Sequence, residues 1–253
     1  MEQQPWYKTF YGEDHHRLFA QWKTQQRNTT EVQQICSLLK LADGSSILDL
    51  CCGTGRHSVL LASLGYKVSG QDLNEAALKR ASAQAEEQNV QVQWDLRDMR
   101  DIPFEDEFDA IINISTAFGY LEDENEDQKV LQQVYKALKP GGLFLIEVIH
   151  RDGVLCKYLP FVVTRCEDGS IIIDERTFNL ATSRNEGKMT MIFPDERRAV
   201  YTESVRLYTL KELIDKFTAA NLHIHGYYSG LHGQPLYLEA RRLVIIGRKP
   251  AAL

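Results

Sequence analysis

Short apolar runs alternate with amphipathic segments between residues 46 and 148. Such runs are typical of buried parallel strands, and they lie at 46–50, 66–70, 90–94, 108–114 and 143–148. The segments between them have helical signals, as at the potential N-cap Asn74 and in the apolar periodicity of 127–138. Strands alternating with helices form right-handed βαβ units, so the pattern predicts an α/β fold with a mostly parallel sheet covered on both faces.

The pattern changes near residue 161. From there to residue 208 the chain is rich in β-forming residues and predicts three or four antiparallel strands inserted into the α/β winding. Three turn signals divide this region: Glu167–Gly169, Asn185–Gly187 and Pro194–Asp195. A capped helix is expected from Thr209, and two last strands at 223–229 and 243–248. Nearer the N-terminus, Thr30 with Gln33 predicts another capping box.

Composition narrows the class of protein. The 253 residues are 43% hydrophobic and 25% charged, as in an ordinary soluble globular chain, and the N-terminus lacks the apolar region of a signal peptide. Five cysteines without metal-type spacing predict reduced thiols in a cytoplasm and no metal site. A net charge of −6 without a basic run argues against a nucleic-acid substrate, and no apolar run is long enough to predict a membrane span.

The segment after the first predicted strand carries the clearest chemistry. Asp49 is followed by Cys51, Cys52, Gly53, Thr54 and Gly55, and a helix leaves this turn. Glycines let a backbone approach a ligand closely, and a helix N-terminus favours an anionic group. A dinucleotide fits such a turn, because Gly53-x-Gly55-x-x-Ser58 is close to the nucleotide fingerprint and Asp72 follows at a suitable distance. S-adenosylmethionine (SAM) fits it as well.

Three acidic residues favour SAM. Asp49, Asp72 and Asp98 each lie at the end of a successive predicted strand, and so at one edge of the sheet. Asp72 could accept both ribose hydroxyls, while Asp98 could meet the adenine amine and Met99 could pack on its ring. Carboxylates attract a cationic sulfonium, whereas they repel the negative pyrophosphate of a dinucleotide. Residues Leu73, Asn113 and Ile114 complete the expected cofactor contacts beside Cys51, Gly53 and Gly55.

The ordered motifs LDLCCGTG, SGQDLN, RDMRDIPF, FDAIINISTAFGYL and ALKPGGLFLIEV resemble those of class I SAM-dependent methyltransferases. The insertion and the C-terminal segment resemble a small-molecule branch that includes sugar N-methyltransferases of antibiotic pathways. The resemblance implies a Rossmann-like sheet of seven strands whose last strand is antiparallel. Cys51 departs from the family, which usually has glycine there. Because cysteine carries a Cβ atom, this difference affects the expected shape of the turn.

Four segments are expected on this basis: an N-terminal lid or arm at 1–28, the SAM-binding core at 29–150, a β-rich insertion at 151–208 that covers the substrate or dimerises, and core-completing elements at 209–253. Catalytic candidates are His150, which follows the fifth strand and could act as a general base, and Tyr11, which the resemblance places over the sulfonium.

The expected function is methyl transfer from SAM to an oxygen or nitrogen of a small molecule. Two alternatives remain open from the sequence: an NAD-dependent oxidoreductase that uses the same glycine turn, and a non-catalytic SAM-binding subunit that stabilises a partner. The expected partner is a small-molecule methyl acceptor, with neither nucleic acid nor membrane, and the insertion offers edge strands for a homodimer.

Overall fold

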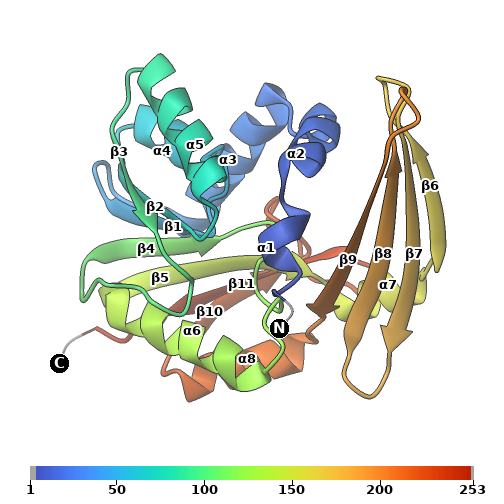
Figure 1. The fold of residues 1–253 in the computed structure, drawn as a ribbon. Coiled ribbons are helices and arrows are strands. Elements are labelled where there is room, and N and C mark those ends of the chain that lie inside the picture. The colour runs from blue at the N-terminus through green and yellow to red at the C-terminus, as the bar shows by residue number, and fades with distance from the viewer. Residues whose placement is uncertain (1–3, 252–253) are drawn as a thin grey trace.

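A seven-stranded sheet forms the centre of the protein (Figure 1). The computed structural model describes residues 4–251, so residues 1–3 of the expected arm and 252–253 of the last segment lie outside the described residues. The strands follow the order β10-β11-β5-β4-β1-β2-β3. Strands β1 to β5 run parallel, whereas β11 is antiparallel to both β5 and β10. Their bounds are β1 Ser46–Leu50, β2 Lys67–Asp72, β3 Val92–Leu96, β4 Phe108–Asn113, β5 Leu138–Ile149, β10 His223–Tyr228 and β11 Arg242–Arg248.

Helices cover both faces of this sheet, which confirms the predicted fold class (Figure 1). On one face lie α3 (Gln25–Leu39), α4 (Ser58–Ser63) and α5 (Glu75–Glu87). On the other lie α6 (Glu124–Ala137) and α8 (Leu210–Ala219). Two apolar cores result, one on each face, because the central strands bury side chains in both directions.

Two predicted boundaries near helix ends are wrong. Helix α3 begins at Gln25 because the extended backbone of Thr24 lets its hydroxyl accept a hydrogen bond from the N–H of Arg27. Thr30 therefore lies inside the helix and donates to the Gln26 carbonyl instead of capping. Strand β5 begins at Leu138, directly after α6, with an irregular register before Leu143. The caps predicted at Asn74 and Thr209 are confirmed, the latter as a full capping box.

The insertion forms a separate antiparallel sheet of order β6-β7-β8-β9, as predicted. Its strands are β6 Phe161–Arg165, β7 Ile171–Asn179, β8 Arg184–Ile192 and β9 Arg198–Arg206, and α7 (Arg151–Cys156) leads into it from β5. The turn predicted at Asn185–Gly187 is wrong, because these residues lie within β8. The chain turns earlier, where the Asn179 side chain accepts hydrogen bonds from the N–H groups of Ala181 and Thr182.

The N-terminal elements lie between the two sheets (Figure 1). They are α1 (Tyr7–Phe10), α2 (Glu13–Phe19) and a 3-10 turn (Ala20–Trp22). Phe10 and Leu18 pack with Met189 and Met191 of the insertion in a third apolar cluster. Asp14 accepts two hydrogen bonds from Arg197, at 2.9 and 2.7 Å. The N-terminal elements are thus attached to the antiparallel sheet. Within residues 4–251, no helix has the length and apolarity needed to cross a membrane.

A buried carboxyl in α6 should make stability depend on pH. Asp127 is fully buried and accepts a hydrogen bond from Tyr208. Burial raises its pKa to about 6. Because the folded state holds this proton more tightly than the unfolded state, the group favours folding at acid pH, and this contribution is lost as the pH rises through about 6.

We therefore compare the free energy of unfolding of Asp127→Asn with that of the wild type. We expect the difference, variant minus wild type, to increase by about 3 kcal/mol from about pH 4 to about pH 8, since one pKa unit corresponds to about 1.4 kcal/mol. Urea titrations of both chains at each pH measure this difference. Equal differences between the two chains at both pH values would contradict the prediction.

Candidate cofactor site

The glycine turn between β1 and α4 contains three residues with left-handed backbone. Cys51, Gly53 and Gly55 have φ angles of 61°, 56° and 72°. At Gly55 a Cβ atom would lie 2.7 Å from the Trp94 ring and 2.8 Å from the Ala81 methyl, so both conformation and packing require glycine. At Gly53 a Cβ would meet no atom within 4 Å. The turn is therefore closely packed behind Gly55 and open beside Gly53.

Cys51 keeps the left-handed turn despite its side chain. Its sulfur lies 3.7 Å from the Met99 sulfur, and the side chain packs against the apolar core. This contact compensates part of the conformational cost, which is about 1–2 kcal/mol for a left-handed residue with a Cβ. Burial raises the pKa of Cys51 well above its usual range, so the thiol stays protonated and the side chain serves as packing.

Asp72, the last residue of β2, connects the glycine turn to helix α5. One carboxylate oxygen accepts from the N–H of Gly53 at 2.8 Å, and the other accepts from the N–H of Asn74 at 2.8 Å. No cation pairs with this carboxylate among residues 4–251. Burial raises its pKa, and the backbone hydrogen bonds only partly oppose that shift.

Asp49 lies behind the turn, in β1. It is 2% exposed and accepts a hydrogen bond of 2.6 Å from the hydroxyl of Ser58, the first residue of α4. Burial raises the pKa of Asp49 as well. The side chain thus fixes the start of α4 against β1 and places a second carboxyl group near the turn.

The loop after β3 is fixed by two different contacts. Asp98 is held by Arg100, whose guanidinium donates to both carboxylate oxygens at 2.8 Å. Burial alone would raise the pKa of Asp98, but the hydrogen bonds from Arg100 outweigh it and the pKa is lowered. The amide of Gln71, fully buried in β2, donates to the Asp98 carbonyl at 2.9 Å. Met99 is buried in the core beneath the loop.

A depression of about 490 Å³ lies at this edge of the sheet. It brings together Leu73, Asn74 and Asp98, with Lys8 of the N-terminal arm facing them. Asn113 and Ile114, at the end of β4, are both buried. The Asn113 amide donates to the Leu50 carbonyl at 2.9 Å, so its side chain fixes the end of β1 next to Cys51. The predicted cofactor residues therefore surround the carboxyl ends of β1, β2, β3 and β4.

The N-terminal arm reaches the carboxyl ends of these strands through Tyr11. Its carbonyl accepts a hydrogen bond of 3.2 Å from the Asn74 side chain, and its hydroxyl is hydrogen-bonded to the hydroxyl of Tyr120. Burial raises the pKa of Tyr11, so the phenol is neutral near pH 7. The structure thus places Tyr11 beside the glycine turn, where it presents a neutral hydroxyl and an aromatic ring.

His150 lies apart from the glycine turn. It is 3% exposed and therefore buried. Its Nδ1 lies 2.8 Å from the Ala240 carbonyl, and its backbone N–H donates to Arg241. Nε2 lies 4.0 Å from Asp152. These contacts attach His150 to the segment before β11.

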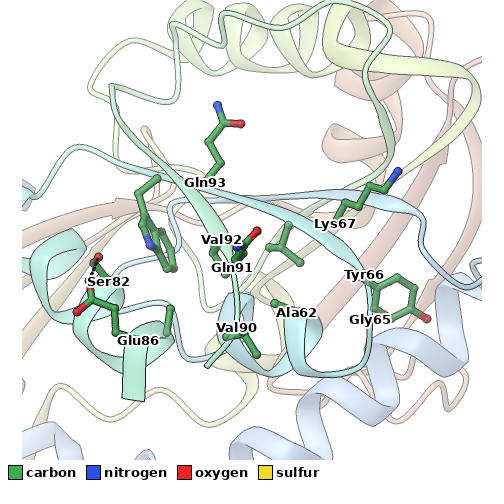
Figure 2. A pocket seen from close by; sticks show the side chains of 13 residues that line it. Ala62, Gly65, Tyr66, Lys67, Ser82, Glu86, Val90, Gln91, Val92 and Gln93 are labelled. Atoms are coloured by element: carbon green, nitrogen blue, oxygen red, sulfur yellow. Dashed lines mark hydrogen bonds between the residues drawn. The ribbon is translucent and has the colours of Figure 1, made fainter. Parts of the chain in front are cut away.

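A larger cavity, of about 790 Å³, lies at the opposite edge of the sheet (Figure 2). Figure 2 shows Lys67 and Val92, the first residues of β2 and β3, among its lining side chains. Ligands of open parallel sheets bind at the carboxyl ends of the strands. The smaller depression is lined by two of the predicted cofactor residues, Leu73 and Asp98, whereas none of them lines this larger cavity.

Several residues that shape the site were missed from the sequence. Arg56 pairs with Glu31 of α3 and donates to the Ser115 hydroxyl at 2.9 Å, which connects the glycine turn to the loop after β4. Ser115 and Thr116 are both left-handed, with φ angles of 70° and 66°. No local pattern marks these contacts, because they join segments far apart in the chain.

The site suits SAM better than a dinucleotide. Asp49 is buried and Asp72 is half-buried; both have hydroxyl or backbone partners, and neither is paired with a cation in the described chain. A cationic sulfonium would be attracted to them, whereas the negative pyrophosphate of a dinucleotide would be repelled. The open space at Gly53 would let backbone approach such a ligand. Asp72, Asp98 and the turn from Cys51 to Gly55 are the groups that would hold it.

Part of the chain matches a known protein family. Residues 47–142 match a family described as "Methyltransferase domain". Over 122 residues the chain is 34% identical to the glycine/sarcosine N-methyltransferase of Halorhodospira halochloris. This match covers 46% of this chain and 44% of that protein. The chain spans about half or less of the length of the curated relatives it matches.

Two solved structures share the fold over almost the whole chain. The CcbJ methyltransferase from Streptomyces caelestis superimposes with a TM-score of 0.84 at 18% identity, covering 96% of this chain and 99% of that one. SAM-bound CalS10, an amino pentose methyltransferase from Micromonospora echinaspora, gives 0.68 at 20% identity and covers 94% and 98%. Residues 47–142 thus form a methyltransferase domain, and the whole chain shares its fold with known methyltransferases, among them one that binds SAM.

Proposed function

We propose that this protein transfers the methyl group of SAM to an oxygen or nitrogen atom of a small molecule. The observation that carries the proposal is the glycine turn, which is open at Gly53 and bonded through Asp72 to the start of α5. The N-terminal arm and the antiparallel sheet stand over the same edge of the central sheet and could enclose an acceptor.

Bound SAM supplies a methyl group that its sulfonium already activates for transfer to a nucleophile. The chain has to bind and orient the two molecules and exclude water, and orientation can contribute about 7–11 kcal/mol. Asp72 and Asp98 would hold the nucleoside, with Leu73, Met99, Asn113 and Ile114 around it. Asp49, Cys51, Gly53 and Gly55 shape the turn.

Tyr11 and His150 are proposed for different tasks. Tyr11 would form the wall next to the reacting groups, since Tyr120 and Asn74 hold it beside the turn. His150 would serve as the general base for an alcohol acceptor through Nε2, because Nδ1 is engaged by the Ala240 carbonyl.

The names of related proteins support a small acceptor. The Halorhodospira relative is a glycine/sarcosine N-methyltransferase, and CalS10 is an amino pentose methyltransferase. We further propose the four-segment division, with the arm and the insertion covering the acceptor. Residue 28, the last of the proposed arm, lies inside α3.

Calorimetric titration tests the proposal. We expect S-adenosylhomocysteine (SAH), the product form of the cofactor, to bind saturably and NADH not to bind, because acids surround the turn. Absence of SAH binding at high micromolar concentration, or binding of NADH alone, would reject the proposal. SAH binding by a chain that transfers no methyl group and co-purifies with a tight partner would favour the non-catalytic subunit.

A further inference from the structure

A row of residues crosses the antiparallel sheet in direct register. Arg176 of β7 pairs with Gly187 of β8, which pairs with Glu203 of β9. Residues directly opposite one another point to the same face of a sheet, as do positions two apart along each strand. Met189, two positions from Gly187, is buried in the cluster that contains Phe10 of the arm. The row therefore lies on the sheet face that is turned toward the arm.

Gly187 provides the space in which the Glu203 side chain lies. A Cβ atom at position 187 would be 2.8 Å from both Cγ and Oε1 of Glu203. Contacts this short do not occur, so the Glu203 carboxylate extends across β8 over the missing side chain. The role of Gly187 is spatial, since this position has no left-handed backbone.

The charges in this row leave one carboxylate uncompensated. Asp174 accepts a hydrogen bond of 2.9 Å from Arg176, so these two charges pair with each other. Within residues 4–251, no hydrogen bond or ion pair reaches the carboxylate of Glu203. Burial raises the pKa of Glu203, Asp174 raises it further, and Arg176 partly offsets both effects. Glu203 is half-buried, and a carboxylate without a partner is stabilised by a donor, most strongly by a cationic one.

Glu203 also lines a cavity next to the N-terminal arm. The cavity measures about 580 Å³, and Trp6 of the arm lines it together with Arg176, Gly187 and Glu203. The Trp6 ring lies 4.7 Å from the ring of Tyr120. The hydroxyl of Tyr120 is hydrogen-bonded to Tyr11, whose carbonyl accepts from Asn74 next to Asp72. The Trp6 wall of the cavity is thus linked through Tyr120 and Tyr11 to Asn74, two positions after Asp72.

We infer that Glu203 binds an ammonium group of the methyl acceptor, and hence that the acceptor is an amine. Before transfer the nitrogen has to lose one proton, which the Glu203 carboxylate can accept, so that the nitrogen lone pair is free to take the methyl group. This inference rests on the proposed function and narrows its substrate class. An ammonium group donates hydrogen bonds and carries the opposite charge, so it satisfies the carboxylate in both respects. The Trp6 ring at the cavity wall adds a favourable surface for a cation. A neutral alcohol would leave the charge of Glu203 uncompensated.

Chemical capping of amines tests the acceptor class. Full-length protein is incubated with methyl-tritiated SAM and a small-molecule cell extract from the source organism, either untreated or treated with acetic anhydride in water to acetylate amines. We expect label in the untreated extract and at least tenfold less in the acetylated one. Equal labelling of both extracts, or labelling of neither by protein that binds SAH, would overturn the inference. Failure to bind SAH would instead overturn the proposed function itself.

Three variants locate the effect at Glu203. We expect Glu203→Gln to lower labelling of the untreated extract at least tenfold with unchanged SAH affinity, which excludes misfolding. Gly187→Ala should act in the same direction, because its methyl displaces the carboxylate. Glu167→Gln, an exposed residue between β6 and β7, is the matched control and should label as the wild type does. Wild-type labelling by Glu203→Gln would overturn the assignment of this residue.

Discussion

Replacing Asp72 with alanine is expected to weaken SAH binding at least tenfold. The carboxylate fixes the N–H groups of Gly53 and Asn74 at 2.8 Å each, and it has further lone pairs for the ribose hydroxyls. Each hydrogen bond lost to a charged group costs about 1.5–3 kcal/mol, and 1.4 kcal/mol already corresponds to a factor of ten. Calorimetry with SAH measures the change directly.

Two controls separate binding from folding. Asp43→Ala removes an exposed carboxylate before β1, at the opposite edge of the sheet, and should leave SAH affinity unchanged. Asp72→Asn keeps one side-chain oxygen as an acceptor for the turn and should lie between the wild type and Asp72→Ala. If Asp72→Ala binds SAH as tightly as the wild type while the chain stays folded, Asp72 does not hold the cofactor.

The central sheet could be predicted because its signals are local. Strand β1 has the predicted bounds, Ser46–Leu50, since a short apolar run ends directly at the glycine turn. Asn74 was predicted as a cap because its side chain only has to reach the N–H of Ala77, three residues on. Both features depend on neighbouring residues in the sequence, and the same holds for the acids at the strand ends.

The rest depends on contacts between distant segments. Gly187 was expected in a turn, yet it lies within β8, where the Glu203 side chain sixteen positions away occupies the space beside it. The hydrogen bond from Asn74 to Tyr11 joins residues 63 positions apart, and neither residue type predicts the other. For this reason the glycine turn could be predicted from the motif, whereas the placement of the arm and of the cavity beside Glu203 required the structure.

Alanine at Gly53 and at Gly65 should separate ligand contact from backbone strain. Both glycines are left-handed, with φ angles of 56° and 90°, and a Cβ at either position meets no protein atom within 4 Å. Each substitution should therefore lower the free energy of unfolding by about 1–2 kcal/mol, the cost of a left-handed residue with a Cβ. Gly65 lies in the turn before β2, at the edge opposite the cofactor turn.

Only Gly53→Ala should also lose SAH affinity, by tenfold or more, because its methyl group would occupy the space into which the cofactor has to fit. Urea titration and calorimetry on both variants measure the two quantities. Gly55→Ala provides the opposite case: clashes with Trp94 and Ala81 should add about 1–3 kcal/mol of destabilisation to the backbone cost. Equal SAH affinities for Gly53→Ala and Gly65→Ala would mean that the open side of the turn does not face the cofactor, and the ligand would then have to bind elsewhere along the edge.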